Sequence, residues 1–289
     1  MEKRRYKDGI DLSIVGFGAM ALVGMEQRDC DAIVAESVEG GINYFDVAPS
    51  YGDGEAEVKL GRAIAPFRSR VFLASKTFAR DADRAGRELD QSLQHLRIEC
   101  LDLYQFHAMY KVSEVERAFA RGGAAEAVAR AQEQGKVRFV GFSAHSVEAA
   151  LAMMDRMTFD SVLFPVNFVL YSKGDFGPQV LERARQLGVA RLAVKAMALG
   201  PWPRSERREF PNCWYRPVVD PELARQAFRF ALSEDVTAVV PPGDHRLFRM
   251  AVRFAKDFTP MSEAERAELL ASAAGVEPLF RSGRSGTSR

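Results

Sequence analysis

The sequence predicts an α/β fold, a (β/α)8 TIM barrel with a short N-terminal hairpin and an additional C-terminal helix. Three observations predict it. Eight short apolar segments rich in β-forming residues recur between residues 14 and 240, helical segments with recognisable ends lie between them, and each unit takes about 30 residues. Because parallel neighbours need crossover connections, eight such units within about 250 residues favour a closed barrel over an open doubly wound sheet.

The expected strands are too short to be helices, and their apolar character is typical of strands that are buried on both faces. In chain order they comprise residues 14–17, 43–45, 71–74, 101–106, 137–142, 161–166, 190–194 and 236–240. We expect each strand to be followed by a helix that packs against the outside of the barrel.

The helices between these strands have marked ends. Asp29, Asp81 and Asp220 stand where a side-chain cap is expected at the helix N-terminus, and Pro follows Asp220 in the first turn. Gly135 and Gly188 stand directly before strands, where a helix commonly ends on a left-handed residue. These signals divide the chain into strand-and-helix units.

Other segments fall outside this repeat. Residues 1–12 predict a short hairpin over the barrel bottom, with the turn at residues 8–9. Residues 198–219 form a long insertion rich in Pro and aromatic residues, and a Ser-x-x-Glu capping box opens the helix expected over 262–274. We therefore expect one barrel domain over residues 1–280 and a flexible tail, rich in Ser, Gly and Arg, over residues 281–289.

Composition narrows the class of protein. The 289 residues include 40 Lys and Arg against 39 Asp and Glu, and a net charge of +1 gives little attraction for nucleic acid or an anionic membrane. No apolar run approaches the ~20 residues of a spanning helix, and no apolar stretch follows the charged residues 1–5 as in a signal peptide. Cys30, Cys100 and Cys213 lie far apart, which indicates neither a disulfide framework nor a metal site. We expect a cytoplasmic enzyme with a small-molecule substrate and no metal, and leave its oligomeric state open.

Three ionisable residues end three successive strands. Asp46, Lys76 and His107 are separated by one strand-and-helix unit each. Each alone is typical of a solvated loop or of a core histidine, but the carboxyl ends of barrel strands meet at one mouth, where active sites lie. Because it is costly to gather three such groups in a partly buried mouth, we interpret them as a catalytic cluster.

The segment Asp46-Val47-Ala48-Pro49-Ser50-Tyr51-Gly52 resembles the Asp-x-Ala-x-x-Tyr-Gly signature of the aldo-keto reductases. Lys76 and His107 match the other two catalytic positions of that family in order and spacing, and residues 16–20 and 240–243 resemble its first strand-loop and the segment after its eighth strand. The similarity runs from about residue 10 to about residue 255. It implies a (β/α)8 barrel that reduces carbonyl groups with NADPH, without metal or flavin.

The chemistry of these residues fits that reaction. Carbonyl reduction needs a hydride, which no side chain supplies, and a proton, which Tyr51 carries at neutral pH. We expect the ammonium of Lys76 to favour the phenolate form of Tyr51, and Asp46 to keep Lys76 charged. His107 is expected to polarise the substrate carbonyl through a hydrogen bond.

The resemblance also implies cofactor contacts, with departures from the family pattern. We expect Gly18 and Met20 to contribute from the first strand-loop and Asn167 from strand six. The family's usual Ser-Asn after strand five is Ser143-Ala144-His145 in this chain, so we expect Ser143 to keep its contact with the nicotinamide amide and His145 to replace the missing Asn. The stacking aromatic residue after strand seven is not evident.

Lys195 ends strand seven. We expect it near the pyrophosphate or the substrate, with a buttressing ion pair as the alternative.

Coenzyme choice depends on the helix after strand eight. Gly243, His245, Arg246 and Arg249 are the candidate contacts, at a helix N-terminus whose free N–H groups suit an anion. Arg246 is the expected partner of the 2′-phosphate of NADPH, because Arg binds phosphate bidentately. A solvated helix face is the alternative, and since Asp244 would repel a phosphate, NADH is not excluded.

Trp202, Trp214 and Tyr215 in the insertion are expected to line the substrate pocket, which favours an apolar or aromatic carbonyl compound. A surface loop or an interface is the alternative for this insertion. Two other functions stay open: a cofactor-binding redox-sensing or regulatory protein on the same barrel, with little turnover, and a lyase or isomerase in which Lys76 forms a Schiff base.

Overall fold

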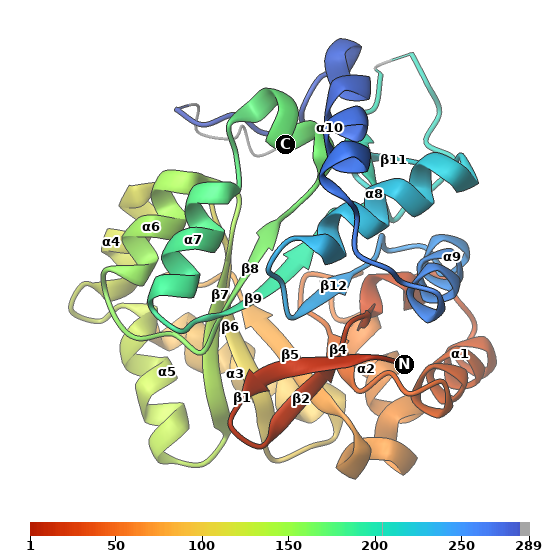
Figure 1. Cartoon of the computed structure of the whole chain (residues 1–289). Coiled ribbons are helices and arrows are strands. Elements are labelled where there is room, and N and C mark those ends of the chain that lie inside the picture. The colour runs from red at the N-terminus through yellow and green to blue at the C-terminus, as the bar shows by residue number, and fades with distance from the viewer. Residues whose placement is uncertain (204, 284–289) are drawn as a thin grey trace.

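The computed structural model describes residues 1–203 and 205–283. Eight parallel strands form one sheet in the order β3, β4, β5, β6, β7, β8, β9 and β12, and a parallel bridge between Val15 and Val239 joins its two edges into a barrel (Figure 1). The strands are β3 (Gly16–Gly18), β4 (Tyr44–Asp46), β5 (Phe72–Thr77), β6 (Leu101–Met109), β7 (Val137–Ala144), β8 (Ser161–Pro165), β9 (Ala190–Val194) and β12 (Ala238–Val240). The prediction of a (β/α)8 barrel is confirmed.

Helices surround the barrel, and the unit after β6 contains two of them, α4 and α5, before β7 begins. The α-helices are α1 (Gln27–Glu39), α2 (Glu55–Ile64), α3 (Ala82–Leu96), α4 (Val112–Phe119), α5 (Ala124–Glu133), α6 (Val147–Met154), α7 (Pro178–Gln186), α8 (Pro221–Ser233), α9 (His245–Lys256) and α10 (Glu263–Ser272). Within the described ranges, none of them has the length and apolar character needed to cross a lipid bilayer.

Most of the predicted helix ends are confirmed. The side chains of Asp81 and Asp220 accept backbone hydrogen bonds in the first turns of α3 and α8. Gly135 and Gly188 follow α5 and α7 with φ of 71° and 67°, the left-handed conformation expected there. The prediction for Asp29 was wrong. Because α1 begins two residues earlier, this carboxylate lies inside the first turn and supplies no cap.

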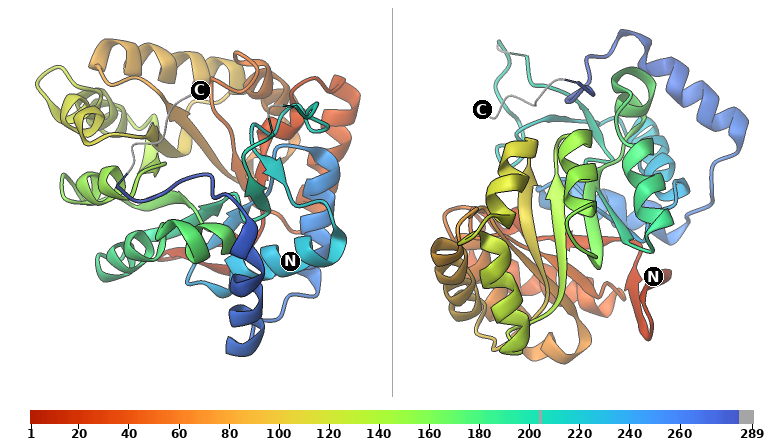
Figure 2. Two further views of the ribbon diagram at one scale, coloured as in Figure 1. Left: turned by 90° about the horizontal axis from the view of Figure 1, so that it is seen from above. Right: turned by 90° about the vertical axis from the view of Figure 1, so that its left-hand side faces the viewer.

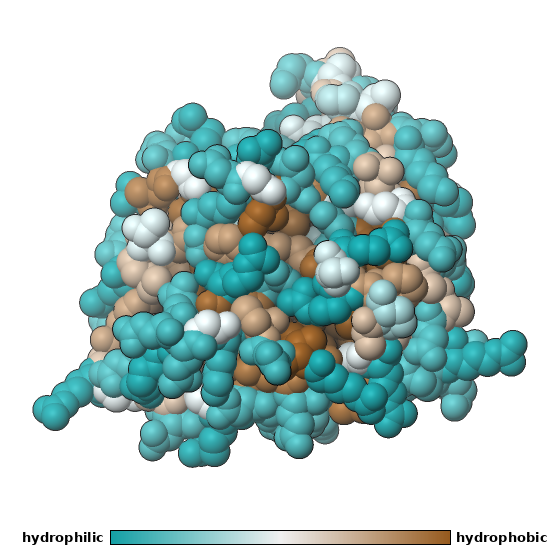
Figure 3. Space-filling view, turned by 90° about the horizontal axis from the view of Figure 1, so that it is seen from below, coloured by the Kyte–Doolittle hydropathy of each residue, from teal (hydrophilic) through white to brown (hydrophobic). Residues whose placement is uncertain are grey.

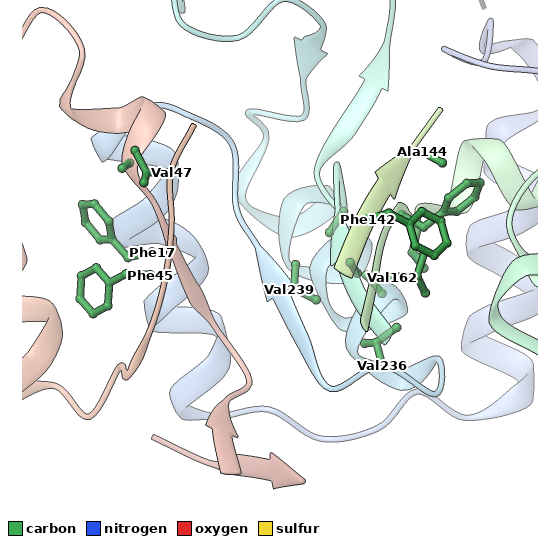
Figure 4. Packing of buried hydrophobic residues seen from close by; sticks show 14 of the residues in the cluster. Phe17, Phe45, Val47, Phe142, Ala144, Val162, Val236 and Val239 are labelled. Atoms are coloured by element: carbon green, nitrogen blue, oxygen red, sulfur yellow. The ribbon is translucent and has the colours of Figure 1, made fainter. Parts of the chain in front are cut away.

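Alternation along the strands sorts side chains between two cores. Phe17 and Phe45 point outward and stack at 5.2 Å between ring centroids, in the cluster that fills the space between sheet and helices (Figure 4). Tyr44, Leu103 and Leu163 belong to a second cluster inside the barrel. Since successive residues of a strand face opposite sides, the residue two positions after an inward residue also points inward.

The predicted N-terminal hairpin is present. Strands β1 (Lys3–Lys7) and β2 (Ile10–Ser13) pair antiparallel, and Tyr6 and Leu12 pack into the inner cluster, so the hairpin closes one end of the barrel. The face seen from below is mostly hydrophilic, with hydrophobic residues confined to small patches (Figure 3).

The opposite end is covered by two segments. The insertion after β9 forms a small antiparallel pair, β10 (Ala198–Gly200) with β11 (Arg216–Pro217), and the chain after α10 crosses the upper face (Figure 2). The expected capping box at the start of α10 is confirmed. The flexible tail predicted for residues 281–289 falls largely on residues 284–289, outside the described residues, and the N–H of Gly283 donates to Glu148.

Candidate active site

A cavity of about 250 Å³ lies at the carboxyl ends of the barrel strands. Asp46, Lys76 and His107 point into it because each lies an even number of positions after an inward-facing residue of its strand. Tyr51 reaches the same cavity from the loop after β4. The structure thus brings all four predicted catalytic residues to one wall of one cavity.

Lys76 is the centre of this cluster. Its ammonium forms an ion pair with Asp46, donates to the carbonyl of Val47 at 2.9 Å and lies 3.2 Å from the hydroxyl of Tyr51. Lys76 is 0% exposed and Asp46 2%. A buried lysine held between a carboxylate and a phenol is constrained in both position and charge.

Two residues that the sequence analysis missed complete the binding of Asp46. The hydroxyl of Tyr44 and the side-chain amide of Gln105 donate to its second carboxylate oxygen at 3.2 and 3.1 Å. Both precede a predicted catalytic residue by two positions on the same strand, so a strict period of two could have placed them inside the barrel. They hold the carboxylate in the orientation that the ion pair requires.

The protonation states follow from burial and charge. Burial lowers the pKa of Lys76, but Asp46 and Tyr51 outweigh it and raise the pKa above its usual value, so the ammonium persists. Burial raises the pKa of Tyr51, and the opposing effect of Lys76 only partly offsets it. The expected effect of Lys76 on Tyr51 has the right sign, but burial dominates, so the phenol stays protonated at neutral pH.

His107 is a neutral imidazole in the same wall. Burial first, and the charge of Lys76 second, hold the pKa of His107 well below its usual range. Its ring stacks on Phe78 with centroids 4.0 Å apart, and its Nδ1 is buried without a hydrogen-bond partner among the described residues. A neutral ring can donate one hydrogen bond, which suits an uncharged carbonyl oxygen.

An irregularity in β6 fixes the position of His107. The register shifts between Phe106 and Met109, and Ala108 has φ of 53°, in the left-handed region. The N–H of Ala108 donates to the hydroxyl of Ser143 at 2.7 Å, and Arg80 donates to the carbonyl of His107 at 2.8 Å. Bulges of this kind re-aim a side chain beside an active site.

Six of the predicted cofactor contacts line the cavity: Gly18, Met20, Ser143, His145, Lys195 and Gly243. Lys195 Nζ lies 3.0 Å from Nε2 of His145 and forms no ion pair with a carboxylate in the part of the chain that is described, so the alternative of a buttressing ion pair is not observed. Burial, with a smaller effect of Lys76, lowers the pKa of Lys195 to about 7.

Asn167 lies behind the cavity wall. Its side-chain amide donates to the carbonyl of Lys195 at 3.1 Å and accepts from the N–H of Leu170 at 2.9 Å. Lys195 has φ of 64°, a conformation that costs free energy in a residue with a side chain. Asn167 therefore holds a strained turn, and both ends of its amide already have partners.

His245, Arg246 and Arg249 lie on α9, outside the residues that line the cavity. Arg246 makes a bidentate contact with Asp244, at 3.0 and 3.1 Å, and stacks on a ring of the insertion. Arg249 pairs with Glu36 at 2.9 Å. Each guanidinium already has a carboxylate partner, with which a phosphate would have to compete.

The insertion contributes Trp214 and Tyr215 to the cavity lining, whereas Trp202 lies outside it and donates to a backbone carbonyl within the insertion at 2.8 Å.

Two further contacts at the cavity were not predicted from the sequence. Asn212 lines the cavity and donates to the carbonyl of Met20 at 3.3 Å, and Phe280 stacks on His145 with centroids 5.1 Å apart. Both join residues far apart in the chain, for which a local sequence pattern has no signal.

The comparison with known families agrees with this geometry. The sequence model of the Aldo/keto reductase family matches residues 14–240, which is most of the chain. The chain belongs to the aldo/keto reductase family.

Curated relatives of this aldo/keto reductase are distant. L-galactose dehydrogenase of Arabidopsis thaliana is 25% identical over 206 residues, covering 66% of this chain and 64% of the relative. Aldo-keto reductase YhdN of Bacillus subtilis is 31% identical over 157 residues, covering 48% and 46%. The matched part of the chain thus spans between about half and just under two thirds of the relatives' lengths.

Solved structures are similar over nearly the whole fold. Aldo-keto reductase AKR11C1 from Bacillus halodurans, in its holo form, has a TM-score of 0.73 at 21% identity and covers 95% of this chain and 96% of its own. An aldo-keto reductase from Klebsiella pneumoniae, solved in complex with NADPH, has a TM-score of 0.73 at 18% identity, with all of both chains covered. At such identities the likeness establishes the fold alone.

The buried Lys195 of this aldo/keto reductase is expected to reduce stability. Lys195→Met should raise the free energy of unfolding by about 1–4 kcal/mol near pH 7, because it removes a buried amine that has no carboxylate partner among the described residues. The folded pKa lies below the unfolded one, so the loss of stability is complete below about pH 7 and disappears as the pH rises to the usual lysine pKa of about 10.4.

Urea unfolding at pH 7 and at pH 10.5 measures this difference. Lys7→Met, which breaks a partly exposed 2.9 Å ion pair with Asp160, is the matched control and should change stability in the opposite direction by less than about 1 kcal/mol. A loss of stability in Lys195→Met at pH 7 would contradict the expectation.

Proposed function

We propose that this chain is an NADPH-dependent oxidoreductase that reduces an aldehyde or ketone to an alcohol, with Tyr51 as the proton donor. The observation that carries the proposal is the 3.2 Å contact between the Tyr51 hydroxyl and the Lys76 ammonium, in a cavity that His107 also lines. A proton source, a cation to stabilise its conjugate base and a neutral hydrogen-bond donor are the groups that carbonyl reduction requires.

The hydride has to come from a bound nicotinamide, because no side chain can supply it. Some residues of the cavity lining can form hydrogen bonds with the amide group of the nicotinamide. The Nδ1 of His145 is buried without a partner among the described residues, and the hydroxyl of Ser143 accepts one hydrogen bond and keeps its own proton to donate. Asn167 supports this role less, since it is not among the residues that line the cavity and its amide binds the backbone at Lys195 and Leu170.

The chain's own residues perform the acid chemistry. Tyr51 donates its hydroxyl proton to the oxygen of the reduced carbonyl, and the ammonium of Lys76 stabilises the phenolate that remains. Asp46 keeps Lys76 charged and in place through the ion pair. Neutral His107 donates a hydrogen bond to the substrate oxygen and so orients the carbonyl.

The same geometry argues against a Schiff base on Lys76. A lysine attacks a carbonyl only as the free amine, and Asp46 and Tyr51 raise the pKa of Lys76 above its usual value.

We also infer a reducing, cytoplasmic location, supported by the three unpaired cysteines of the described chain, Cys30, Cys100 and Cys213.

The direct test has two steps. NADPH and NADH are titrated by fluorescence, and oxidation of the bound form is then followed by absorbance against a panel of aldehydes, ketones and quinones. NADPH oxidation that depends on a carbonyl compound would support the proposal. Tight binding of NADPH without turnover on any member of the panel would contradict it and favour the redox-sensing or regulatory alternative.

Coenzyme preference should depend on the contact between Arg246 and Asp244. Arg246→Leu is expected to lower NADPH affinity relative to NADH by about tenfold, because it removes the cation nearest the start of α9 that can bind the 2′-phosphate. Asp244→Asn keeps a residue that caps helices well but frees Arg246, so it should change the ratio of the two dissociation constants the other way. Equal effects on both coenzymes would show that this pair does not contact the phosphate.

A further inference from the structure

The cavity of this enzyme contains a second lysine that the proposed proton transfer does not use. Lys195 is 7% exposed and lines the same cavity as Tyr51 and His107. Asn167 holds its backbone in the left-handed conformation through the hydrogen bond to the Lys195 carbonyl. Burial of the amine and the left-handed backbone conformation each lower the stability of the fold. A residue that combines two such unfavourable features typically has a function.

The charges of the cavity lining do not balance. Among the described lining residues, Asp46 and Lys76 neutralise each other in an ion pair, whereas Lys195 has no carboxylate partner. Burial lowers the pKa of both His107 and His145 well below the usual range, so neither imidazole adds charge at neutral pH. When Lys195 is protonated, the cavity therefore holds one uncompensated positive charge.

The surroundings of Lys195 leave room for a ligand. Its Nζ lies 3.0 Å from Nε2 of His145, which accepts at most one of the three protons of the ammonium. The rings of Trp214 and Phe280 lie 5.4 and 6.0 Å from Nζ and flank it with apolar surface. The amine can thus direct its remaining protons at a negatively charged group that enters between aromatic side chains.

We propose that Lys195, oriented by His145, is a subsite for an anionic group of the substrate, so that the enzyme selects aldehydes or ketones that also carry a carboxylate or phosphate. The inference rests on the proposed carbonyl reduction, since the carbonyl end would lie at Tyr51 and His107 while the anionic end pairs with Lys195. An anion supplies the countercharge that the cavity lacks, and its binding in turn favours the protonated amine.

A bound cofactor also carries anionic groups, and its pyrophosphate is the other possible partner of Lys195. We favour the substrate because Lys195 lines the same cavity as Tyr51 and His107, and because its amine lies 5.4 Å from the ring of Trp214, which the insertion contributes to that cavity. If Lys195 binds the pyrophosphate, its substitution should weaken NADPH affinity, and if it binds the substrate anion, NADPH affinity should stay the same. One set of Lys195 variants therefore separates the two partners.

The test uses two aldehydes, 4-carboxybenzaldehyde and its methyl ester, whose difference in intrinsic reactivity is the same for every variant and cancels when acid-to-ester ratios are compared between variants. Wild type should have the higher kcat/KM for the acid, and Lys195→Met should reduce the acid-to-ester ratio of kcat/KM by about tenfold to a hundredfold. Lys195→Arg, which keeps the charge, should retain most of the preference. An unchanged ratio in Lys195→Met would overturn the proposal. If the affinity for NADPH were weakened at the same time, the amine would be assigned to the cofactor instead.

The pH dependence is a second readout, which a merely structural role would not produce. The pKa of Lys195 is lowered to about 7, so the preference for the acid should be present below that pH and decline above it. In Lys195→Arg it should persist, because Arg stays charged. The other titratable groups of the described cavity lining are Asp46 from β4, Tyr51 after β4, Lys76 from β5, His107 from β6, Tyr110 after β6, His145 after β7 and Tyr215 from the insertion. Their effects on catalysis are common to acid and ester and cancel in the ratio.

An equilibrium measurement separates the subsite from the reaction. Binding of 4-(hydroxymethyl)benzoate is followed through the fluorescence of Trp214, which lies beside Lys195. Weakening of about tenfold in Lys195→Met supports the subsite even if no aldehyde is reduced, in which case only the proposed function fails. Equal binding to wild type and Lys195→Met would overturn the subsite whatever the turnover.

Discussion

Tyr51→Phe is expected to lower the turnover number by about 10²- to 10⁴-fold, the range that positioned acid catalysis contributes. The change removes one oxygen atom and leaves the ring that lines the cavity. Lys76 loses its 3.2 Å contact but keeps Asp46 and the carbonyl of Val47, so the charge and position of the ammonium should survive. Stopped-flow or steady-state oxidation of NADPH measures the loss, and fluorescence titration should show a nearly unchanged NADPH affinity.

Tyr171→Phe is the matched control for this substitution. The Tyr171 hydroxyl is buried without a hydrogen-bond partner among the described residues, and its ring packs on Phe230, so the variant should keep both turnover and stability. If Tyr51→Phe retained more than about a tenth of the wild-type turnover, another group would have to supply the proton, and the assignment of Tyr51 would be wrong.

Lys76→Met is expected to damage both stability and catalysis. It leaves the Asp46 carboxylate buried without its counterion, and removing one partner of a buried ion pair costs about 3–5 kcal/mol. Turnover should fall at least as far as in Tyr51→Phe, because the phenolate loses the cation that stabilises it. Urea unfolding measures the first effect and NADPH oxidation the second.

The double variant Asp46→Asn with Lys76→Met separates the two effects. It leaves no net charge in the buried pair, so it should recover part of the free energy of unfolding while turnover stays low. Lys136→Met, which breaks the exposed 2.7 Å ion pair with Asp90, is the control and should change stability by less than about 1 kcal/mol. If Lys76→Met unfolded at the urea concentration of wild type, the pair could not be buried as described.

The strand-and-helix repeat explains how much of the site was accessible from the sequence. A repeat of about 30 residues together with the period of two along each strand predicts that Asp46, Lys76 and His107 face one mouth of a barrel. The same rule, applied more strictly, would also have included Tyr44 and Gln105. Tyr51 follows from its motif, because the loop after β4 is short and the motif keeps it close to Asp46.

Contacts between distant segments were not predictable in this way. Asn212 reaches Met20 across the chain, and Phe280 stacks on His145 from beyond α10. The helix at Asp29 shows the same limit at short range, since Asp is favourable inside the first turn as well as at the cap position before it. Asn167 was predicted to contact the cofactor from its place at the end of strand six, and its hydrogen bond to the carbonyl of Lys195 was not anticipated.

By itself, the sequence determined the barrel, its ends and the identity of the four residues at its mouth, because hydrophobic periodicity and motif spacing are local properties of the chain. The tertiary structure alone decided the protonation of those residues. Burial outweighs Lys76 at Tyr51, and at the nearby Lys195 burial together with the charge of Lys76 lowers the pKa, with no carboxylate paired to it among the described residues. Desolvation and Coulomb interactions depend on which groups meet in space, and no pattern along the chain records the neighbours that a side chain lacks.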